Sequence, residues 1–476
     1  MMIKRVMKCS LLAACAVVSF SAMAGNVDAN MAQAAANTFV KQKFAALPGK
    51  LMAPATADIK LTHTVASSVS GNAYYVFNIT GGGWVIIAGD DRAKQVLAYS
   101  DHGTMDMNNL SAPAKYYLDH YKTQIEKVQN FKGKFSTKKT TQRSLVVEPL
   151  MKSDWGQNVP FDRQCPQQYG SYCPVGCAGL AMAQILNYWE YPKEVPNGLP
   201  SYYNEYTYSS VPALDPTTFD WDNILDKYTI LINGTSLSWA EGVNDTNKAE
   251  VAKLCRYAAQ SCKMNFRSSG GSGSNVEKQK DGFLLMGYDT NMKLVGIQAV
   301  ETRHTWNTWD YTDEEWLALI DAQLEAGHPI PYSTEGGIDG HAYVIDGVDA
   351  DGLYHCNWGF YGADDGYFAF GAFNPVIQGQ TLDLNDGFLY MVIDLYPYEG
   401  YISPNAPAGT VVTRGDVDGN GIVDMDDLSA LINYLLNESS PINTAGAASC
   451  SNADDTTAVD MDDLSALINF LLTNLW

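Results

Sequence analysis

Two polar segments divide this chain, and a packed hydrophobic core is not expected to continue through either of them. Residues 132–144, KGKFSTKKTTQRS, are basic and show no hydrophobic periodicity. Residues 399–413 belong to a stretch rich in proline and glycine. A chain of 476 residues is expected to form about three domains. We therefore predict compact segments over residues 25–143, 144–398 and 414–476, with 399–413 as a linker and 132–144 as an exposed proteolytic site.

The N-terminus has the features of an export signal. Positively charged residues precede an apolar stretch over residues 11–20, and residues 22–24, Ala-Met-Ala, match a signal-peptidase cleavage site. We predict a signal peptide over residues 1–24 and a secreted protein. The alternative is a lipoprotein box, LAAC, that ends at Cys15, and it is less favoured because few apolar residues precede Cys15. No later stretch is long and apolar enough to span a membrane.

The net charge of the chain limits its possible partners, and the number of cysteines indicates whether all of them can form disulfides. The net charge of −22 argues against a nucleic-acid partner, because phosphate binding needs a basic surface. Removal of the signal peptide leaves an odd number of cysteines, so at least one thiol is expected to be free or intermolecular. The remaining cysteines are Cys165, Cys173, Cys177, Cys255, Cys262, Cys356 and Cys450.

The pattern of apolar residues predicts a mixed fold in the first two segments. In the first, AQAAANTFVKQKF and APAKYYLDHYKTQIEKVQNF are typical of helices, and AYYVFNI and GWVIIAG of strands. In the second, a helical run comes early and the strand-like runs HAYVIDGV, GLYHCNW, GYFAF and FLYMVIDL come late. Helices followed by a run of strands favour an α+β fold.

Cys177 stands directly before a run that is expected to be helical and that ends at Pro192. The free N–H groups and the dipole of a helix N-terminus favour a thiolate there, so Cys177 is a candidate nucleophile. Among seven histidines, His341 follows the small residues of EGGIDG and opens an apolar strand. We expect His341 to be its base, although the spacing of the two residues alone does not exclude a structural histidine.

Four motifs in order resemble the streptopain family of cysteine peptidases. They are DWGQNVPFDRQCP, CPVGCAGLAMAQILNYWEYP, GHAYVIDG and NWGFYGADDGYF, and WVIIAGDDRAKQVLAYSDHG upstream is similar to the family's propeptide. The resemblance implies an α+β, papain-like catalytic domain over 144–398 with protein substrates and no catalytic cofactor. It also implies an inhibitory α+β propeptide over 25–143. The exposed basic segment predicts that this propeptide is released by cleavage near Lys138, Lys139 or Arg143.

The resemblance assigns roles to single residues. Cys177 would be the nucleophile, His341 the general base and acid, and Gln157 an oxyanion donor together with the Cys177 N–H. Asn357 and Trp358 match the segment that flanks and shields the histidine. Asn357 is a candidate for orienting His341, but a side chain on a strand can point to either face.

Two departures from the family's pattern bear on specificity. Ala178-Gly179-Leu180 replaces the more common Val-Ala-Thr, and WGFYG, residues 358–362, replaces WGWGG. The Gly/Ser-rich stretch 268–275 resembles a loop at the family's substrate cleft, or is a plain flexible loop. Two rival functions remain: a cysteine acyltransferase or amidase on the same fold, and a catalytically inactive adhesion or docking protein.

The segment DVDGNGIVDMDD, residues 416–427, has the spacing of a calcium-binding loop. Oxygen ligands recur at alternate positions, glycine stands at the sixth, and a backbone carbonyl serves at the seventh. One helix follows, and the loop ends in Asp rather than Glu, so the segment resembles a dockerin. That resemblance implies a small all-α domain with structural Ca²⁺ and a cohesin-type partner. The predicted ligands are Asp416, Asp418, Asn420, Ile422 through its carbonyl, Asp424 and Asp427.

The tail contains an internal repeat, because VDMDDLSALINYLL at 423–436 returns as VDMDDLSALINFLL at 459–472. The second loop lacks a carboxylate at its first position and glycine at its sixth, so it is expected to bind calcium weakly or not at all. Its candidate ligands are Asn452, Asp454, Thr456 and Asp463. The two helices are predicted to cover each other with matching apolar faces, Leu428, Leu431, Ile432 and Leu435 against Leu464, Leu467, Ile468 and Leu471.

Overall fold

A computed structural model describes most of the chain between Gly25 and Thr473. The described residues are 25–44, 58–130, 145–232, 236–298, 311, 313–335, 340–370, 376–377, 380–381, 388–398, 401, 403–406, 415, 417, 423, 425–436 and 461–473. The predicted signal peptide, the basic segment 132–144, Cys450 and most of both calcium loops lie outside them. None of the described helices is long and apolar enough to cross a lipid bilayer.

The described part of the N-terminal segment forms two helices and a four-stranded meander. Its elements are α1 (Ala29–Phe44), β1 (Ile59–Ala66), β2 (Asn72–Ile79), β3 (Trp84–Ala88), β4 (Val96–Ser100) and α2 (Ala112–Asn130). Both predicted helices and both predicted strands are confirmed. In α1 the buried residues Ala32, Ala36, Val40 and Phe44 recur every fourth position, so one stripe of the helix packs on the sheet.

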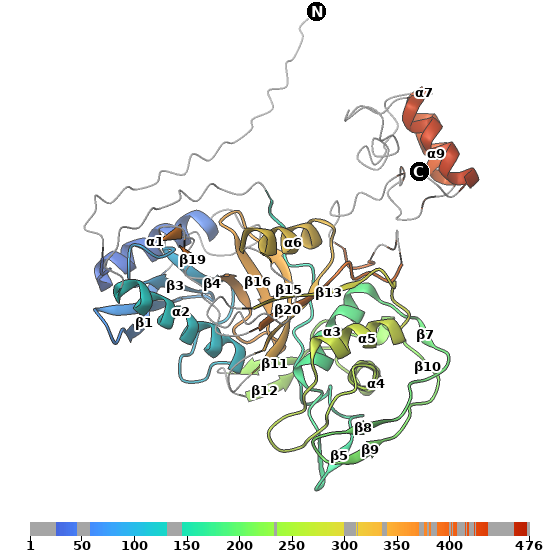
Figure 1. Ribbon diagram of the computed structural model, residues 1–476, viewed down its shortest axis with the longest axis horizontal. Helices are drawn as coiled ribbons and strands as arrows, with labels where there is room; N and C mark the ends of the chain where they lie inside the picture. The colour runs from blue at the N-terminus through green and yellow to red at the C-terminus, as the bar shows by residue number, and fades with distance from the viewer. Residues whose placement is uncertain are drawn as a thin grey trace, which may run out of the picture.

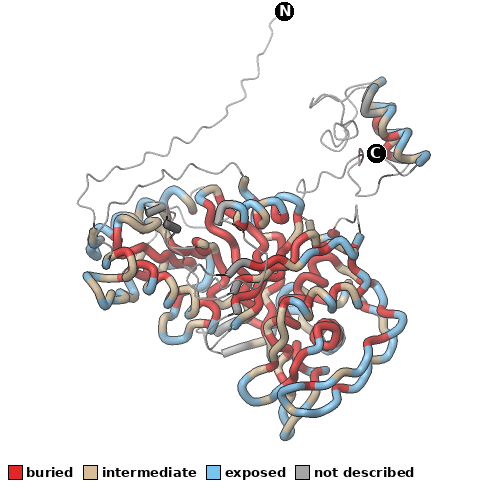
Figure 2. Tube along the Cα trace, viewed as in Figure 1, coloured by how far each residue is buried: buried red, intermediate tan, exposed pale blue. Residues whose placement is uncertain are grey.

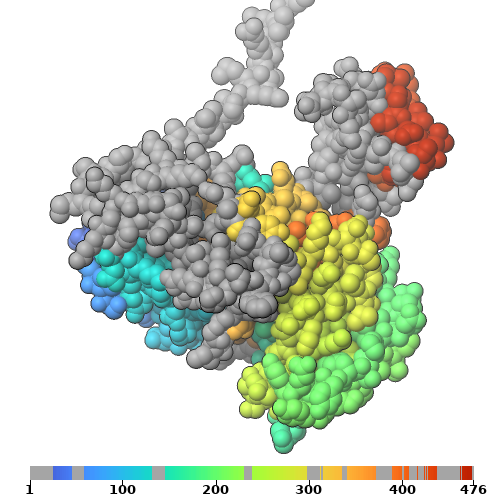
Figure 3. Space-filling view, viewed as in Figure 1, coloured from blue at the N-terminus to red at the C-terminus, as the bar shows by residue number. Residues whose placement is uncertain are grey.

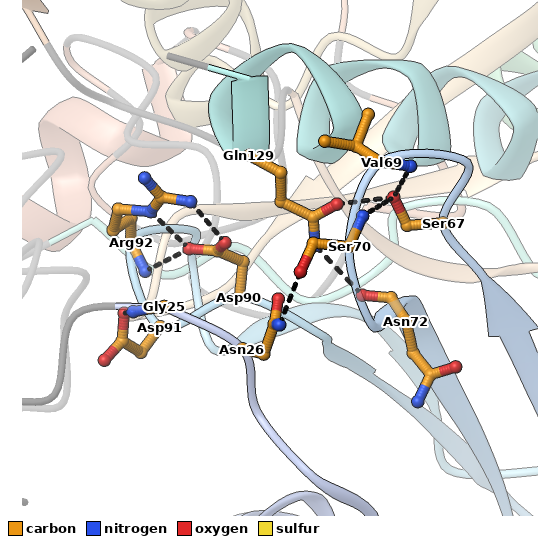
Figure 4. A network of polar contacts seen from close by, with 10 residues as sticks. All are labelled: Gly25, Asn26, Ser67, Val69, Ser70, Asn72, Asp90, Asp91, Arg92 and Gln129. Atoms are coloured by element: carbon orange, nitrogen blue, oxygen red, sulfur yellow. Dashed lines mark hydrogen bonds and ion pairs between the residues drawn. The ribbon is translucent and has the colours of Figure 1, made fainter. Parts of the chain in front are cut away.

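Polar contacts hold the turns of this segment (Figure 4). Gln129, near the end of α2, accepts a hydrogen bond from the Ser67 hydroxyl at 2.5 Å and donates to the Asn72 carbonyl at 3.3 Å. Arg92 forms a two-bond contact with the buried Asp90 carboxylate, at 2.7 and 2.6 Å. The C-terminal end of α2 is thereby fixed to the turn between β1 and β2.

The segment predicted to be catalytic, residues 144–398, begins with small hairpins and helices and ends in strands, the order expected of an α+β fold. Its first elements are β5 (Gln167–Gln168), β6 (Ser171–Tyr172), α3 (Cys177–Trp189), β7 (Glu194–Val195), β8 (Tyr202–Asn204), β9 (Ser209–Val211), β10 (Thr217–Thr218), the 3₁₀ turn η2 (Trp221–Asn223), β11 (Thr229–Ile232), β12 (Ser236–Trp239), α4 (Asp245–Ser261) and α5 (Val276–Leu285). Then come β13 (Lys293–Gln298), α6 (Asp313–Glu325), β14 (Ile330–Glu335), β15 (His341–Val348), β16 (Leu353–Asn357), β17 (Gly366–Ala369), β18 (Val376–Ile377), β19 (Gln380–Thr381) and β20 (Phe388–Ile393). The green and yellow surface of its helical part lies away from the blue N-terminal segment in Figure 3.

One ten-stranded sheet joins the two segments, in the order β1-β2-β3-β4-β17-β16-β15-β14-β20-β13 (Figure 1). β4 pairs antiparallel with β17, with Tyr99 opposite Tyr367 and Ala98 opposite Phe368. The buried residues form one continuous cluster through both segments (Figure 2). The residues on the two sides of the basic segment 132–144 therefore contribute to one sheet and one core.

The helix α3 is the centre of the helical part, and every residue after Cys177 in it is buried. Its C-terminal carbonyls accept hydrogen bonds from residues beyond the predicted end of the catalytic segment. The Tyr401 hydroxyl donates to the Trp189 carbonyl, and the Ser403 hydroxyl donates to that of Tyr188. Asn405 donates to the carbonyls of Asn187 and Tyr188 at 3.2 Å. The packed unit thus extends past residue 398.

The tail contains α7 (Met425–Leu436) and α9 (Met461–Thr473), with a small core of its own. Leu431 and Leu467 are fully buried there beside Val417. The prediction is wrong for Ile432 and Ile468, which are both 38% exposed and lie off the packed face.

Candidate active site

Cys177 is the first residue of α3, and Gly176 sets the entry to the helix. Gly176 has φ 84° and makes no side-chain cap hydrogen bond. The first N–H groups of α3 therefore remain available to interact with the Cys177 sulfur. A Cβ at Gly176 would lie 2.6 Å from the Met264 sulfur, which makes glycine necessary. The Leu180 N–H donates to the Gly176 carbonyl at 2.9 Å and starts the helix.

His341 is the first residue of β15, and its side chain is within hydrogen-bonding reach of the Cys177 thiol. Burial on its own would raise the pKa of Cys177. The charge of His341, its hydrogen bond, and the N–H groups of Ala342 and Ala178 outweigh burial and hold the pKa of Cys177 below its usual value. β15 is paired on both sides, with β14 and β16, so the histidine stands on a rigid strand.

The second ring nitrogen of His341 is held by the main chain. Nε2 lies 3.1 Å from the carbonyl oxygen of Trp358. Because a carbonyl oxygen can only accept, Nε2 carries the proton, and Nδ1 is the nitrogen that can exchange a proton with the thiol. The Trp358 side chain is buried against Tyr343 and Phe368, with ring centroids 4.6 and 5.0 Å apart. The Trp358 main chain thus contacts His341, and its side chain packs in the core beside β15 and β17.

Asn357 has other partners than the one expected of it. Its side-chain amide donates to the Ser153 carbonyl at 2.8 Å and accepts from the Gly359 N–H at 3.1 Å. The side chain therefore braces the main chain around it, and the Trp358 carbonyl is what contacts His341. This main-chain group has no side-chain signature, so the sequence could not have pointed to it.

Gln157 is partly exposed, and a main-chain hydrogen bond connects it to the segment just before Cys177. Its carbonyl accepts from the Val175 N–H at 2.9 Å, two residues before Cys177. The preceding Gly156 forms a β-bridge with Phe360. A Cβ on Gly156 would lie 2.4 Å from the Tyr361 ring, so this close approach requires glycine. The segment that carries Gln157 thus lies between the start of α3 and the loop after Trp358.

The other cysteines that the structure describes provide no rival nucleophile. Cys165, Cys173, Cys255, Cys262 and Cys356 are free and buried, and Cys177 alone among the described cysteines is partly exposed. Burial raises the pKa of Cys165 and Cys262 to about 12. Deeply buried neutral thiols of this kind are inert packing residues.

Of the predicted calcium ligands, the structure describes the side chain of Asp427 only. It is fully buried at the start of α7, and its Oδ1 accepts from the Val417 N–H at 2.7 Å. The last position of the loop is thereby tied to its second position. The oxygen donors of Asp416, Asp418, Asn420, Ile422, Asp424 and Asp427 fit Ca²⁺ in chemistry. Among the residues that the structure describes, no group of three or more His, Cys, Asp or Glu side chains is placed to hold a metal ion.

Family models match three parts of the chain. The Peptidase C10 family matches residues 155–368, the Spi protease inhibitor 24–125, and the Dockerin type I domain 414–472. Streptopain from Streptococcus pyogenes serotype M1 is 30% identical over 373 residues, which is 73% of this chain and 86% of streptopain.

More distant relatives cover the same region. The thiol protease/hemagglutinin PrtT of Porphyromonas gingivalis is 21% identical over 361 residues, 72% of this chain but only 38% of PrtT. The structure of a Prevotella intermedia prointerpain A fragment matches with a TM-score of 0.54 at 25% identity, and covers 72% of this chain and 99% of the fragment.

A papain-like α+β fold, with a thiol at a helix start beside a histidine on the sheet, defines a cysteine peptidase. The chain belongs to the peptidase C10 (streptopain) family, and carries a Spi-type inhibitor segment before the peptidase and a dockerin type I domain after it.

Proposed function

We propose that this chain is a secreted cysteine endopeptidase made as a zymogen, in which Cys177 is the nucleophile and His341 the base and acid. The observation that supports it most is the Cys177–His341 pair, in which the histidine lowers the pKa of the thiol against the effect of burial. A thiolate at neutral pH is what attack on a peptide carbonyl requires.

The reaction follows from these groups. The Cys177 sulfur bonds to the scissile carbonyl carbon, and the developing oxyanion accepts hydrogen bonds from the Cys177 N–H and the Gln157 amide. His341 gives its proton to the leaving amine nitrogen as the C–N bond breaks, which leaves a thioester. His341 then takes a proton from water as the water oxygen attacks the thioester carbonyl. The C–S bond breaks, the acid product leaves, and the Cys177 thiolate remains beside the protonated His341, ready for the next cycle.

A peptide-like electrophile tests this assignment. We expect it to label Cys177 in the activated protein, and to label neither Cys177→Ala nor, at a comparable rate, His341→Ala. Product analysis on a peptide substrate distinguishes hydrolysis from transfer to an added amine. Transfer products in place of hydrolysis would favour an acyltransferase, and an absence of both labelling and turnover would favour a docking protein.

We propose that the N-terminal segment inhibits the peptidase until it is cleaved off. Support comes from contacts that cross between the segments at several points. The Lys43 ammonium lies 2.8 Å from the Asp349 carboxylate, the Ser111 N–H donates to Asp364 at 2.7 Å, and the hydroxyls of Tyr117 and Tyr343 are 2.8 Å apart. Cleavage near Lys138, Lys139 or Arg143 would cut the covalent connection, after which only non-covalent contacts, these polar ones together with the β4–β17 pairing and the shared core, would retain the segment.

We propose that the tail is a calcium-dependent domain that docks onto a cohesin-type partner outside the cell. The buried Asp427 and the oxygen ligands of the first loop support a Ca²⁺ site. Each repeat also exposes an equivalent apolar residue at its C-terminal end, Leu436 and Leu472, both 81% exposed. Since the two helices present the same residues, the partner could bind in either of two orientations. Ca²⁺ would neutralise the loop carboxylates and order the turn that precedes α7.

A further inference from the structure

The main chain of Trp358 connects His341 to a buried carboxylate. Its carbonyl accepts from His341 Nε2 at 3.1 Å, and its N–H donates to Oδ1 of Asp365 at 2.8 Å. The two hydrogen bonds lie on the two sides of one α-carbon, so a shift of the Trp358 N–H also displaces its carbonyl. Asp365 therefore contacts the proposed base, His341, indirectly, through the main chain of a single residue, Trp358.

The loop between the two residues is tightly folded. Four of its residues have positive φ, namely Gly359 at 74°, Tyr361 at 60°, Gly362 at 75° and Asp364 at 62°. Non-glycine residues adopt this conformation only when the surrounding structure enforces it. Two bonds close the loop: the Asp365 bond to the Trp358 N–H, and the bond from Trp358 Nε1 to the Asp364 carbonyl at 3.0 Å.

The buried environment of Asp365 favours a hydrogen-bond acceptor over an unpaired carboxylate charge. The residue is 4% exposed, and burial raises its pKa well above the usual value, opposed by the Trp358 N–H and the charge of His355. His355 is itself paired with Asp346 at 2.6 Å. A carboxyl group keeps an acceptor oxygen in either protonation state, so the bond to Trp358 does not depend on its charge.

We propose that Asp365 is a positioning residue for the peptidase reaction, because it fixes the Trp358 carbonyl that holds His341 in line with the Cys177 thiol. This inference rests on the proposed Cys177–His341 pair. A displacement of a catalytic group by about 1 Å can cost on the order of 10²-fold in rate. Loss of the Asp365 acceptor lets the loop relax, while substrate still reaches the same cleft.

The test compares Asp365→Ala with Asp365→Asn in the full chain, after activation by limited proteolysis. We expect Asp365→Ala to lower kcat about 10- to 100-fold with little change in KM, and to raise the pH at which Cys177 becomes reactive toward iodoacetamide. Asp365→Asn keeps an acceptor at the same place and should stay within about threefold of the wild type in kcat.

Asp364→Asn is the matched control. It makes the same change one residue earlier, asparagine tolerates positive φ, and the carboxylate that it replaces contacts Ser111 of the N-terminal segment rather than Trp358. It should leave kcat and the alkylation profile of the activated protein unchanged.

Two results overturn the proposal: wild-type kcat and alkylation profile in Asp365→Ala, or an Asp365→Asn variant as impaired as Asp365→Ala. If Asp365→Ala does not fold, Asp365→Glu takes its place, because it keeps the carboxyl but moves the acceptor by one methylene. Reduced kcat in Asp365→Glu supports the proposal, and wild-type kcat refutes it. Cys177→Ala and His341→Ala are assayed in parallel, and activity in either of them would refute the proposed pair instead.

Discussion

Tyr99 of the N-terminal segment stacks on Tyr367 of the catalytic segment, with ring centroids 5.0 Å apart and an angle of 7° between the planes. The same two residues are partners in the pairing of β4 with β17. The Tyr99 hydroxyl also donates to the buried Asp349 carboxylate at 2.8 Å. The N-terminal segment therefore adds four strands to the catalytic sheet, and its removal would expose the edge of β17.

The first prediction concerns the chemistry. Cys177→Ala should abolish peptide hydrolysis, and His341→Ala should do nearly the same, since the two residues act as a unit. Gln157→Ala should cost about 10²–10³ in kcat, the usual effect of removing one oxyanion donor. The measurement is turnover of a fluorogenic peptide, with circular dichroism to show that each variant is folded. Full activity in Cys177→Ala would exclude Cys177 as the nucleophile.

The first prediction extends to the pH dependence of alkylation, which the lowered pKa of Cys177 also predicts. Because the folded pKa lies below the usual thiol value, the thiolate should persist at pH values where an ordinary cysteine is protonated. In His341→Ala the positive charge is lost while burial remains, so the pKa should rise and alkylation should require higher pH. Identical rate profiles for the wild type and His341→Ala would contradict the pairing.

A second prediction concerns the contact between the segments. Lys43→Met leaves one oxygen of the buried Asp349 without its ion pair, at a cost of about 1–3 kcal/mol to the contact. The precursor should then release its N-terminal segment faster after a fixed dose of trypsin, while kcat of the mature enzyme stays unchanged.

Lys60→Met is the control, since it also removes one lysine from the N-terminal segment, and its pair with Asp58 is exposed. It should not change the rate of release. Equal rates for wild type, Lys43→Met and Lys60→Met would show that the Asp349 pair does not help to retain the segment.

A third prediction concerns stability. His355 is buried between Asp346 and Asp365, and although burial lowers its pKa, the charge and hydrogen bond of Asp346 raise it above the usual value overall. Because the pKa of His355 is higher in the folded than in the unfolded protein, its protonation stabilises the folded state. This stabilisation is fully present at pH values below the unfolded pKa, about 6.5, and is lost as the pH rises through the folded pKa.

Thermal unfolding in a Cys177→Ala background, which prevents self-digestion, measures this effect. The difference in Tm between the parent and His355→Gln should be largest in mildly acidic buffer and should shrink as the pH rises. A difference that grows with pH would reverse the sign and contradict the assignment.

The fourth prediction concerns the tail. Residues 414–476, made alone, should gain helical circular dichroism on addition of Ca²⁺ and lose it with a chelator, because the loop carboxylates repel one another without a cation. Asp416→Ala should weaken this response strongly and Asn452→Ala only slightly. A tail that is equally helical with and without Ca²⁺ would refute the dockerin-like calcium site.

Local sequence patterns predicted most of the helices and strands, but the pairing of strands that are far apart in the sequence could not be predicted. The helix after Cys177 and the strand of His341 follow from periodicity, and the ordered motifs marked both residues. The pairing of Tyr99 with Tyr367 is a contact between residues far apart in sequence, and no local pattern specifies which strand edge β4 joins. Periodicity likewise could not show that the N-terminal segment shares the catalytic core.

The role of a main-chain carbonyl in holding His341 could not be predicted from the sequence either. Asn357 was the natural candidate to orient His341, because side-chain amides do so in triads. The structure uses the Trp358 carbonyl instead, and any residue type could supply one. Ile432 fits an apolar stripe on a helical wheel, but the buried face of two packed short helices is narrower than that stripe.

The hydrogen bonds of Ser403 and Asn405 to the end of α3 limit how far a docked enzyme could reach. Because the packed unit continues to Ala406, only residues 407–414 separate it from Gly415, the first residue of the tail that the structure describes. Eight residues span at most about 30 Å when fully extended. A docked peptidase would then sample a small volume around its anchor, and substrates held on the same scaffold would meet it at an effective concentration of about millimolar. The tether length would thus select substrates by location as well as by sequence.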